Sequence, residues 1–258
     1  MLDRILCLAN SYKHDHRCVA GISLITNQWI RLVGQKVPGC LTIKEASYPD
    51  GQELRILDVF EAELDESCGS NSHPEDMFLN PKPFRHIERF DRPQHYRQLD
   101  GHVSKNLTLL QSCSDRIYFR KFESTSASSS LELIKPDDLW WWIRDEAGKR
   151  KSRALFRIGS ASRIRYDLAV TDPFWLQQLN LLSPGVYPNS LLLGDTPGRT
   201  LLTVSLSEPF ENFHYKLVAG VISVPEVPRR HDSSPRQPAV DRLPSAWHPN
   251  RKMIRNVS

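Results

Sequence analysis

Two segments near opposite ends of the chain constrain its fold more than any other feature. They are residues 17–23, Arg-Cys-Val-Ala-Gly-Ile-Ser, and residues 215–222, Tyr-Lys-Leu-Val-Ala-Gly-Val-Ile. Each is a run of small or β-branched apolar residues entered through a cation, a pattern typical of a short β-strand. Each holds a glycine, Gly21 or Gly220, at which a barrel strand can bend sharply or let another backbone approach. Because no long amphipathic helix accompanies them, the sequence predicts a mainly β protein built from two small β-barrels with short helices.

The length of the chain also favours two units, because 258 residues exceed the usual size of a single domain. The serine-rich run 124–130 is too polar to join a core and is typical of a mobile loop near a boundary. We therefore assign residues 1–115 to a first barrel with its connecting segment and residues 116–224 to a second barrel. Residues 225–258 are rich in proline and arginine, and we expect an extended, disordered basic tail there.

Strand-like patterns recur along both predicted units. In the first unit they cover residues 4–10, 17–25, 28–33 and 53–64. In the second they cover 152–158 and 164–172, which we expect to pair as a long hairpin, and then 201–206 and 214–224. Pro173 after Asp172 predicts a short helix over 172–179 with Asp172 as its cap. Residues 68–100 are rich in His, Pro, Asp and Asn, which predicts an irregular crossing, with a helical turn or two within 84–99.

Charge and hydropathy narrow the classes of partner. The formal net charge is +4, and residues 223–258 alone carry seven Arg or Lys against three Asp or Glu, so the body is balanced. A balanced body argues against binding DNA over its whole surface, whereas the basic tail could attract an acidic partner. No segment approaches the ~18 apolar residues that cross a bilayer, and the N-terminus does not resemble a signal peptide. We expect a cytoplasmic protein without a membrane partner, with its five cysteines reduced.

Cationic and polar residues at the ends of the first three predicted strands form the best candidate binding surface. These residues are Ser11, Lys13, Arg17 and Arg31. Such groups could contact a phosphate backbone. The alternative is structural: Lys13 and Arg17 would keep a loop in solution, and Arg31 would pair with a carboxylate such as Glu61 or Glu63.

Tryptophans could add base stacking to this surface. Trp29 would share a strand face with Arg31, and Trp141 belongs to the run Trp140-Trp141-Trp142. Base-on-aromatic contacts contribute roughly 1 to 3 kcal/mol each and tolerate any sequence. In a strand, however, Trp140 and Trp142 would lie on one face and Trp141 on the other, so at least one of them belongs to a core. Burial is the alternative for Trp29 as well.

No residue constellation identifies a reaction. Ser11 and Lys13 have only the spacing of a nucleophile and its base, and His14, His16 and Cys18 are an incomplete ligand set for zinc. The chain contains no P-loop, dinucleotide fingerprint or His-Glu-x-x-His motif. We therefore expect no catalytic residue, no metal site and no cofactor.

The segment around residues 166–173 has two interpretations. Asp167 and Asp172 could bind a cation. In the alternative, which we favour, Asp172 or Thr171 caps the following helix and Tyr166 locks a barrel corner.

Six of these segments together resemble a known family. Residues 7–13, 17–21, 29–31, 166–173, 205–210 and 215–219, in this order, are similar to the bacterial dual OB-containing domain family. The resemblance spans residues 4 to about 224 and leaves the Pro/Arg tail outside. It implies two OB-type barrels in a bacterial cytoplasmic protein, associated with defence or DNA-processing genes. It assigns no catalytic residue.

Three functions compete. The leading hypothesis is a non-enzymatic module that binds single-stranded or structured DNA or RNA, with first-barrel cations on phosphates and aromatic side chains on bases. The second is a scaffold subunit whose barrels and tail engage another protein. The third is a metal-dependent hydrolase acting on nucleic acid, which would need clustered acids or histidines near a barrel mouth.

Overall fold

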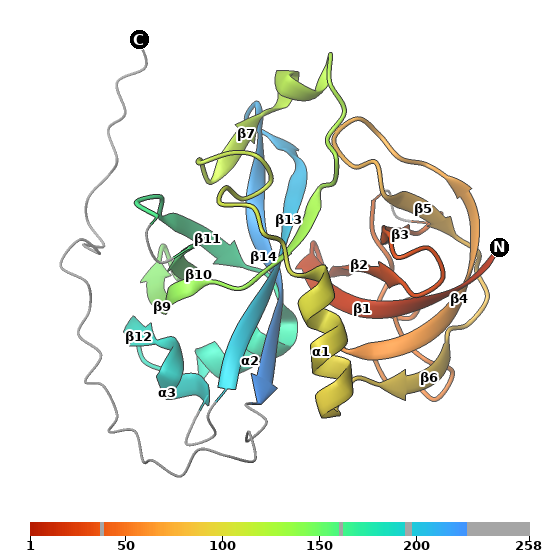
Figure 1. Ribbon diagram of the computed structural model, residues 1–258, viewed down its shortest axis with the longest axis horizontal. Helices are drawn as coiled ribbons and strands as arrows, with labels where there is room; N and C mark the ends of the chain where they lie inside the picture. Colours follow the sequence, from red (N-terminus) through yellow and green to blue (C-terminus); the bar gives the residue numbers. More distant parts are fainter. Residues whose placement is uncertain (37–38, 160–161, 194–197, 226–258) are drawn as a thin grey trace.

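The computed structural model describes residues 1–36, 39–159, 162–193 and 198–225, and it confirms the mainly β architecture (Figure 1). The predicted tail, residues 226–258, lies outside the described residues. The first half of the chain contains β1(Leu2–Lys13), β2(His16–Ser23), β3(Trp29–Val33), β4(Asp58–Ser67), β5(Asp76–Leu79), β6(Arg85–Arg89) and α1(Pro93–His102). The second half contains β7(Arg116–Tyr118), the 3-10 helix η1(Phe119–Phe122), β8(Leu131–Ile134), β9(Asp137–Glu146), β10(Lys149–Arg157), β11(Tyr166–Val170), α2(Pro173–Asn180), β12(Gly185–Pro188), α3(Asn189–Leu193), β13(Gly198–Phe210) and β14(Phe213–Pro225).

The first five strands close into a barrel. They follow the order β1-β2-β3-β5-β4, and β4 pairs back with β1, so every strand of the ring has two neighbours. All of these pairs are antiparallel except β3–β5, which is parallel. The interior holds Ile5, Val19, Ile30, Leu32 and Phe60. Ile30 and Leu32 alternate with Trp29 and Arg31, as the period of two predicts.

The second sheet repeats this strand order. β9, β10 and β11 form an antiparallel meander, β11 pairs in parallel with β14, and β14 pairs with β13. β13 then pairs with β8, which directly precedes β9 in the chain. β8 and β9 together therefore take the place of β1, while β10, β11, β13 and β14 correspond to β2, β3, β4 and β5. Trp141, Phe156, Tyr166, Leu168 and Val218 belong to the core of this unit.

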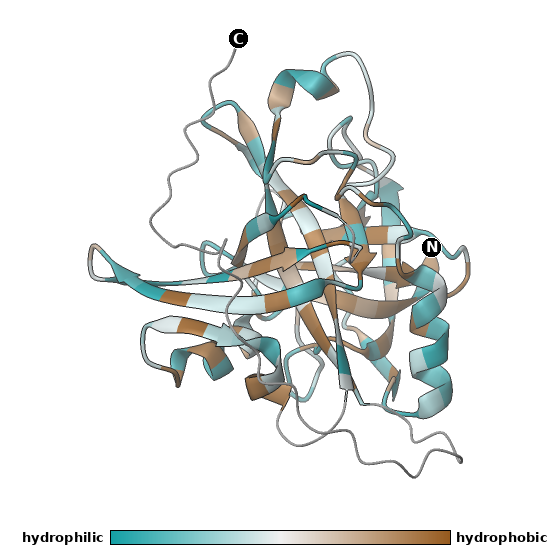
Figure 2. Ribbon diagram, turned by 60° about the vertical axis from the view of Figure 1, so that its left-hand side comes forward, coloured by the Kyte–Doolittle hydropathy of each residue, from teal (hydrophilic) through white to brown (hydrophobic). Residues whose placement is uncertain are grey.

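The two units pack tightly through β1 and β14. An apolar cluster joins Leu6 and Leu8 of the first unit to Leu201 and Ile222 of the second. A Cβ atom on Gly220 would lie 2.3 Å from the carbonyl oxygen of Leu8, so β14 approaches β1 at a distance that only glycine allows. Figure 2 shows the hydrophobic segments concentrated in the middle of the molecule, where the sheets meet, and hydrophilic residues at the outer turns. Both glycines singled out in the sequence lie at close backbone approaches, because a Cβ atom on Gly21 would lie 2.0 Å from the Leu6 carbonyl oxygen.

The predicted elements largely match those of the structure. Every predicted strand overlaps a strand in the structure, although residues 53–57 precede β4 as irregular chain. Asp172 caps α2 as predicted, with Oδ1 accepting from the backbone nitrogens of Phe174 and Trp175 at 3.0 and 3.1 Å. The prediction of an irregular crossing was wrong at β5, which is held by non-local pairing with β3 and β4. Residues 84–99 contain β6 and most of α1.

Candidate functional site

The first barrel brings four of the predicted binding residues to one outer face. Ser11 lies opposite Cys18, Lys13 opposite His16, and Arg31 opposite Ala20, and Trp29 shares the Arg31 face of β3. Ala9 and Ala20 of the same face pack against Leu131 and Ala219 of the second unit, with Trp29 beside them. The face that we predicted as a binding surface is therefore largely covered by the second unit.

The cations of this face already have carboxylate partners. Arg31 is 5% exposed and donates two hydrogen bonds to Asp76, at 2.7 Å to Oδ1 and 2.8 Å to Oδ2. Glu208, from β13 of the second unit, lies 3.9 Å from Arg31 Nη2 and 3.7 Å from Lys13 Nζ. The predicted alternative of an ion pair for Arg31 is thus what the structure contains, with Asp76 in place of the expected Glu61 or Glu63. Those two glutamates pair with other cations, Arg4, Arg85 and Lys82.

Arg17 faces the other side of β2. It is 6% exposed, forms a two-pronged contact with Glu53, and lies 4.6 Å from the centroid of the Tyr12 ring. Its backbone exchanges two hydrogen bonds with Leu41, at 2.7 and 2.8 Å. Arg17 therefore fixes one end of the barrel. Nucleic-acid binding by Ser11, Lys13, Arg17, Trp29 and Arg31 stays a prediction. The face of Ser11, Trp29 and Arg31 is largely covered by the second unit, and Arg17 is held by Glu53 of its own unit.

The loop between β4 and β5 is also held by the second unit. Asn71 Nδ2 donates to the carbonyl oxygen of Phe122 at 2.9 Å, and Glu75 accepts from the backbone nitrogen of Ser130 at 3.2 Å. His73 Nε2 lies 3.3 Å from the carbonyl oxygen of Leu206. Burial, together with the charge of Arg31, lowers the pKa of His73 to about 3, so this ring is neutral. These contacts leave the loop little freedom to close on a ligand.

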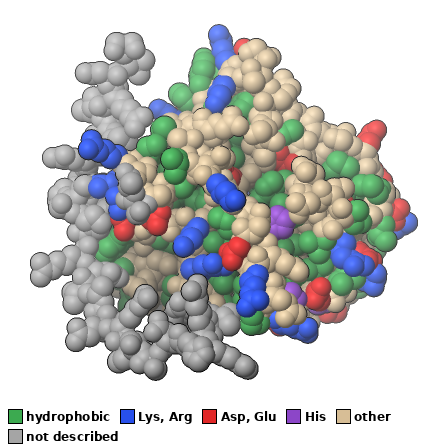
Figure 3. Space-filling model, in the orientation of Figure 1, with side chains coloured by type: hydrophobic (Ala, Val, Ile, Leu, Met, Phe, Trp, Pro, Cys, Tyr) green, Lys and Arg blue, Asp and Glu red, His purple; other side chains and the backbone are tan. Residues whose placement is uncertain are grey.

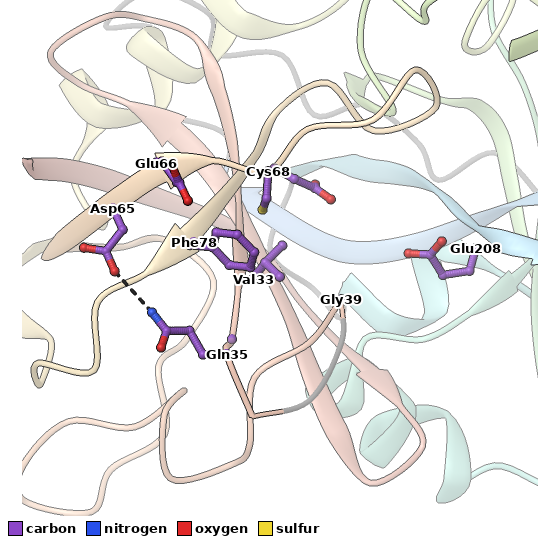
Figure 4. Close-up of a pocket in the computed structure, with 10 residues that line it drawn as sticks. Val33, Gln35, Gly39, Asp65, Glu66, Cys68, Phe78 and Glu208 are labelled. Carbon is purple, nitrogen blue, oxygen red and sulfur yellow. Dashed lines mark hydrogen bonds between the residues drawn. The ribbon is translucent and has the colours of Figure 1, made fainter. Parts of the chain in front are cut away.

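A pocket of about 970 Å³ opens beside this junction (Figure 4). Val33 and Phe78 supply its apolar wall, and Glu208 faces it from the second unit. Asp65, Glu66 and Asp76 also line it, and Gln35 donates to Asp65 Oδ2 at 3.3 Å. Four carboxylates around one opening disfavour a phosphate group, because like charges repel in a partly dry site.

The equivalent face of the second unit has a different character. On the outer side of β9, the half-buried Trp142 lies beside Arg144, whose guanidinium carbon is 4.5 Å from the ring centroid. Arg153 of β10 lies opposite Trp142, and Lys151 lies opposite Arg144. An indole flanked by guanidinium and ammonium groups can stack a base while cations contact its phosphates.

The tip of the β9–β10 hairpin adds further cations. Residues 149–153, Lys-Arg-Lys-Ser-Arg, hold four cations in five positions, and Lys149, Arg150 and Lys151 are exposed. Two carboxylates partly balance them. Glu146 lies 3.0 Å from both Arg144 Nη2 and Lys151 Nζ, and Asp167 of β11 pairs with Arg153. On the face that Figure 3 shows, basic and acidic side chains are interspersed. We call Trp142, Arg144, Lys149, Lys151 and Arg153 the hairpin surface.

Trp141 is on the opposite face of β9. Its side chain is fully buried, its Nε1 donates to Asn189 Oδ1 at 3.0 Å, and its ring lies 5.2 Å from that of Trp175. The structure therefore contains the alternative interpretation, core packing, and no face of Trp141 is open to a base. The residue that the sequence reasoning missed is its neighbour Trp142, although strand alternation and the dense cation run nearby pointed to it.

Tyr166 and Asp172 have the structural roles that we favoured. The Tyr166 hydroxyl accepts from the backbone nitrogen of Leu109 at 2.9 Å and donates to the carbonyl oxygen of Ser112 at 3.1 Å. Asp172 Oδ2 accepts from the backbone nitrogen of Val221 at 2.9 Å, which ties α2 to β14. Within the described residues, no three His, Cys, Asp or Glu side chains gather to hold a metal ion. In the same residues no helix is long and apolar enough to span a bilayer.

Comparison with known families gives one match. A family model described as the dual OB-containing domain matches residues 3–221, which include both barrels and exclude the tail. No curated protein matches the chain.

Proposed function

Because the chain belongs to the dual OB-containing domain family, we propose that it is a non-enzymatic module that binds single-stranded or structured nucleic acid through the hairpin surface. OB folds commonly bind oligonucleotides on the face of their second and third strands, beside the loop between the first and second strands. In the second unit those strands are β10 and β11, and that loop is the tip of the β9–β10 hairpin.

One observation carries the proposal: Trp142 is the aromatic side chain that lies on this face between Arg144 and Arg153. The equivalent face of the first barrel is packed against Leu131 and Ala219, and its arginine is bonded to Asp76. Arg153 is also paired, with Asp167, so the cations that the second face offers to a ligand beside the indole are chiefly the exposed Lys149 and Lys151. The mixed charge around it predicts modest affinity with a clear dependence on salt.

Fluorescence anisotropy with labelled single-stranded DNA and RNA, at low and moderate salt, tests this proposal. Replacing Lys149 and Lys151 together by glutamine should weaken binding and reduce the slope of log affinity against log salt by about 1.4, because each phosphate contact to a single strand contributes about 0.7. Trp142→Ala should weaken binding roughly 5- to 160-fold, the range expected for one lost base stack of about 1–3 kcal/mol.

The matched control is the double variant Lys44→Gln and Lys105→Gln, which removes the same charge from exposed positions outside the hairpin. It should bind like the wild type, apart from a small general effect of net charge. Equal weakening by both double variants would refute the hairpin surface. Absence of binding to any oligonucleotide at low salt would favour the scaffold hypothesis instead. If instead the folded double variant Lys13→Ala and Trp29→Ala loses binding while the hairpin variants keep it, the binding site lies on the first barrel.

A further inference from the structure

Cys18 and Cys40 face one another across two antiparallel segments. Arg17 and Leu41 exchange both of their backbone hydrogen bonds, so the next pair along the ladder, Cys18 and Cys40, lies in a non-hydrogen-bonded position. Residues in such a position have Cα atoms about 4.5 Å apart and side chains on the same face. That separation lies within the range that a disulfide spans without backbone movement.

The two sulfur atoms also sit in a cationic environment. The hydrogen bond from Cys18, with Lys13 and His16 nearby, lowers the pKa of Cys40 to about 6 against the effect of burial. The same hydrogen bond and burial raise the pKa of Cys18. The two thiols therefore titrate as one coupled pair, and the nearby cations favour the thiolate of Cys40, which is the nucleophilic form of the group. By contrast, burial raises the pKa of Cys7 and of Cys68.

We propose that Cys18 and Cys40 form a redox-active pair that hydrogen peroxide oxidises to a disulfide. The thiolate of the pair attacks one peroxide oxygen, the O–O bond breaks, and hydroxide leaves, which gives a sulfenic acid. The second sulfur then attacks the sulfenic sulfur, the S–S bond forms as the S–O bond breaks, and the released hydroxide takes the remaining thiol proton. The other hydroxide takes up the proton that the thiolate had already released to the solvent. Counted from two thiols, one peroxide thus gives one disulfide and two waters, with two electrons passing from sulfur to oxygen. Of the two residues, Cys18 is the less buried.

The disulfide would fasten the segment before Leu41 to β2. Gly34, Gln35 and Gly39 of this segment line the pocket at the junction of the two units, and Gly34 N donates to the carbonyl oxygen of Cys40 at 3.1 Å. A Cβ atom on Gly39 would be 3.1 Å from Lys13 Nζ and 3.3 Å from Glu208 Oε1, which places this segment beside the ion pair between the units. The disulfide would therefore restrain the residues that form one wall of the pocket.

Peptide mapping of the full chain tests the proposal directly. Trypsin places Cys18 in the peptide 18–31 and Cys40 in the peptide 37–44, each with a single cysteine. After treatment with peroxide, blocking of remaining thiols and digestion without reductant, these two peptides should be joined, and dithiothreitol should separate them. The amide of Leu41 should also exchange its hydrogen more slowly in the oxidised protein.

Two variants complete the test. Cys18→Ser should abolish the joined peptides and leave Cys40 open to further oxidation, whereas Cys113→Ser, at an exposed position, should leave the joined peptides unchanged. The proposal is overturned if peroxide oxidises Cys113 of the wild-type chain while peptides 18–31 and 37–44 remain separate. It is equally overturned if either peptide joins one that contains Cys7, Cys68 or Cys113 instead. Both results come from the wild-type protein and do not depend on the folding of a variant.

Discussion

Replacing Gly220 by alanine should open the contact between the two barrels. The new Cβ atom would lie 2.3 Å from the Leu8 carbonyl oxygen and 3.1 Å from Ile56 Cδ1, whereas ordinary contacts of a Cβ atom begin at 3.4 Å. The Ile56 side chain can rotate away, but the Leu8 oxygen belongs to the backbone of β1. The two strands must therefore separate by about 1 Å, along the line where Leu6, Leu201 and Ile222 pack.

The size of the effect follows from two opposing contributions. Overpacking that moves backbone typically costs about 1–3 kcal/mol, and the rigid neighbour puts this site near the upper end. Alanine also lowers the conformational entropy of the unfolded chain relative to glycine, which stabilises the folded protein by about 0.4–1 kcal/mol. We expect the free energy of unfolding to fall by about 2 kcal/mol. For a chain of this size that corresponds to a decrease in Tm of about 4–8 °C.

Thermal unfolding followed by tryptophan fluorescence measures this change. The matched control is Gly101→Ala, in α1, where an added Cβ atom meets nothing within 4 Å. That variant should gain about 0.5–1 kcal/mol, because alanine favours a helix over glycine. A Tm for Gly220→Ala equal to or above that of the wild type would refute the close approach of β14 to β1.

Three further predictions concern buried polar groups. Arg31→Met should lower the free energy of unfolding by about 3–5 kcal/mol, since it leaves the buried Asp76 unpaired. Asp76→Leu should cost less, because Glu208 stays 3.9 Å from Arg31. In urea unfolding the double variant should regain most of the loss, and additive losses would contradict the pairing. Asp172→Ala should cost about 2 kcal/mol, because the cap of α2 and the acceptor for Val221 N are lost together; an unchanged urea midpoint would count against this role. Burial lowers the pKa of Lys216 to about 8, below its unfolded value of 10.5, so the unfolded chain holds the extra proton between these values and stability should rise with pH there. Relative to Lys216→Met, the wild type should gain up to about 3 kcal/mol from pH 8 to 10.5, and a pH-independent difference would exclude the shift.

Local patterns in the sequence were enough to predict most of the elements. Alternation predicted the strands around Ile30 and Leu32 and placed Trp141 opposite its two neighbours, because side chains of a strand change face at every residue. The cap of α2 was predictable because Asp172 acts on backbone atoms two and three residues away. By contrast, β5 carries weak local signals and depends on pairing with β3 and β4.

The candidate site followed less closely from the sequence. The cations of the first barrel were predicted as one surface, but only Lys13 and Arg31 share a face, whereas Arg17 lies on the other side of β2. Their exposure also depends on residues far away in the chain. Arg31 pairs with Asp76, which lies 45 positions further along the chain, and Lys13 pairs with Glu208 of the other unit. The sequence analysis considered Trp142 of the second unit only as one of three adjacent tryptophans. Local sequence does not show which outer face of a sheet a neighbouring unit covers, so it could not show that Trp142 differs from Trp29 in this respect.

The sequence by itself therefore determined most of the strands and the cap of α2, because these depend on neighbours within a few residues, and it marked Gly21 and Gly220 as positions where a backbone can approach. Which backbone approaches each glycine, Leu6 or Leu8, was decided by the tertiary structure. Only the tertiary structure decided which faces are buried, which ions are paired and which cysteines meet, because packing the two barrels joins residues that the chain keeps far apart. Of two faces with related strand order, the first is covered where the units meet, whereas the second carries the half-buried Trp142 and the exposed Lys149 and Lys151.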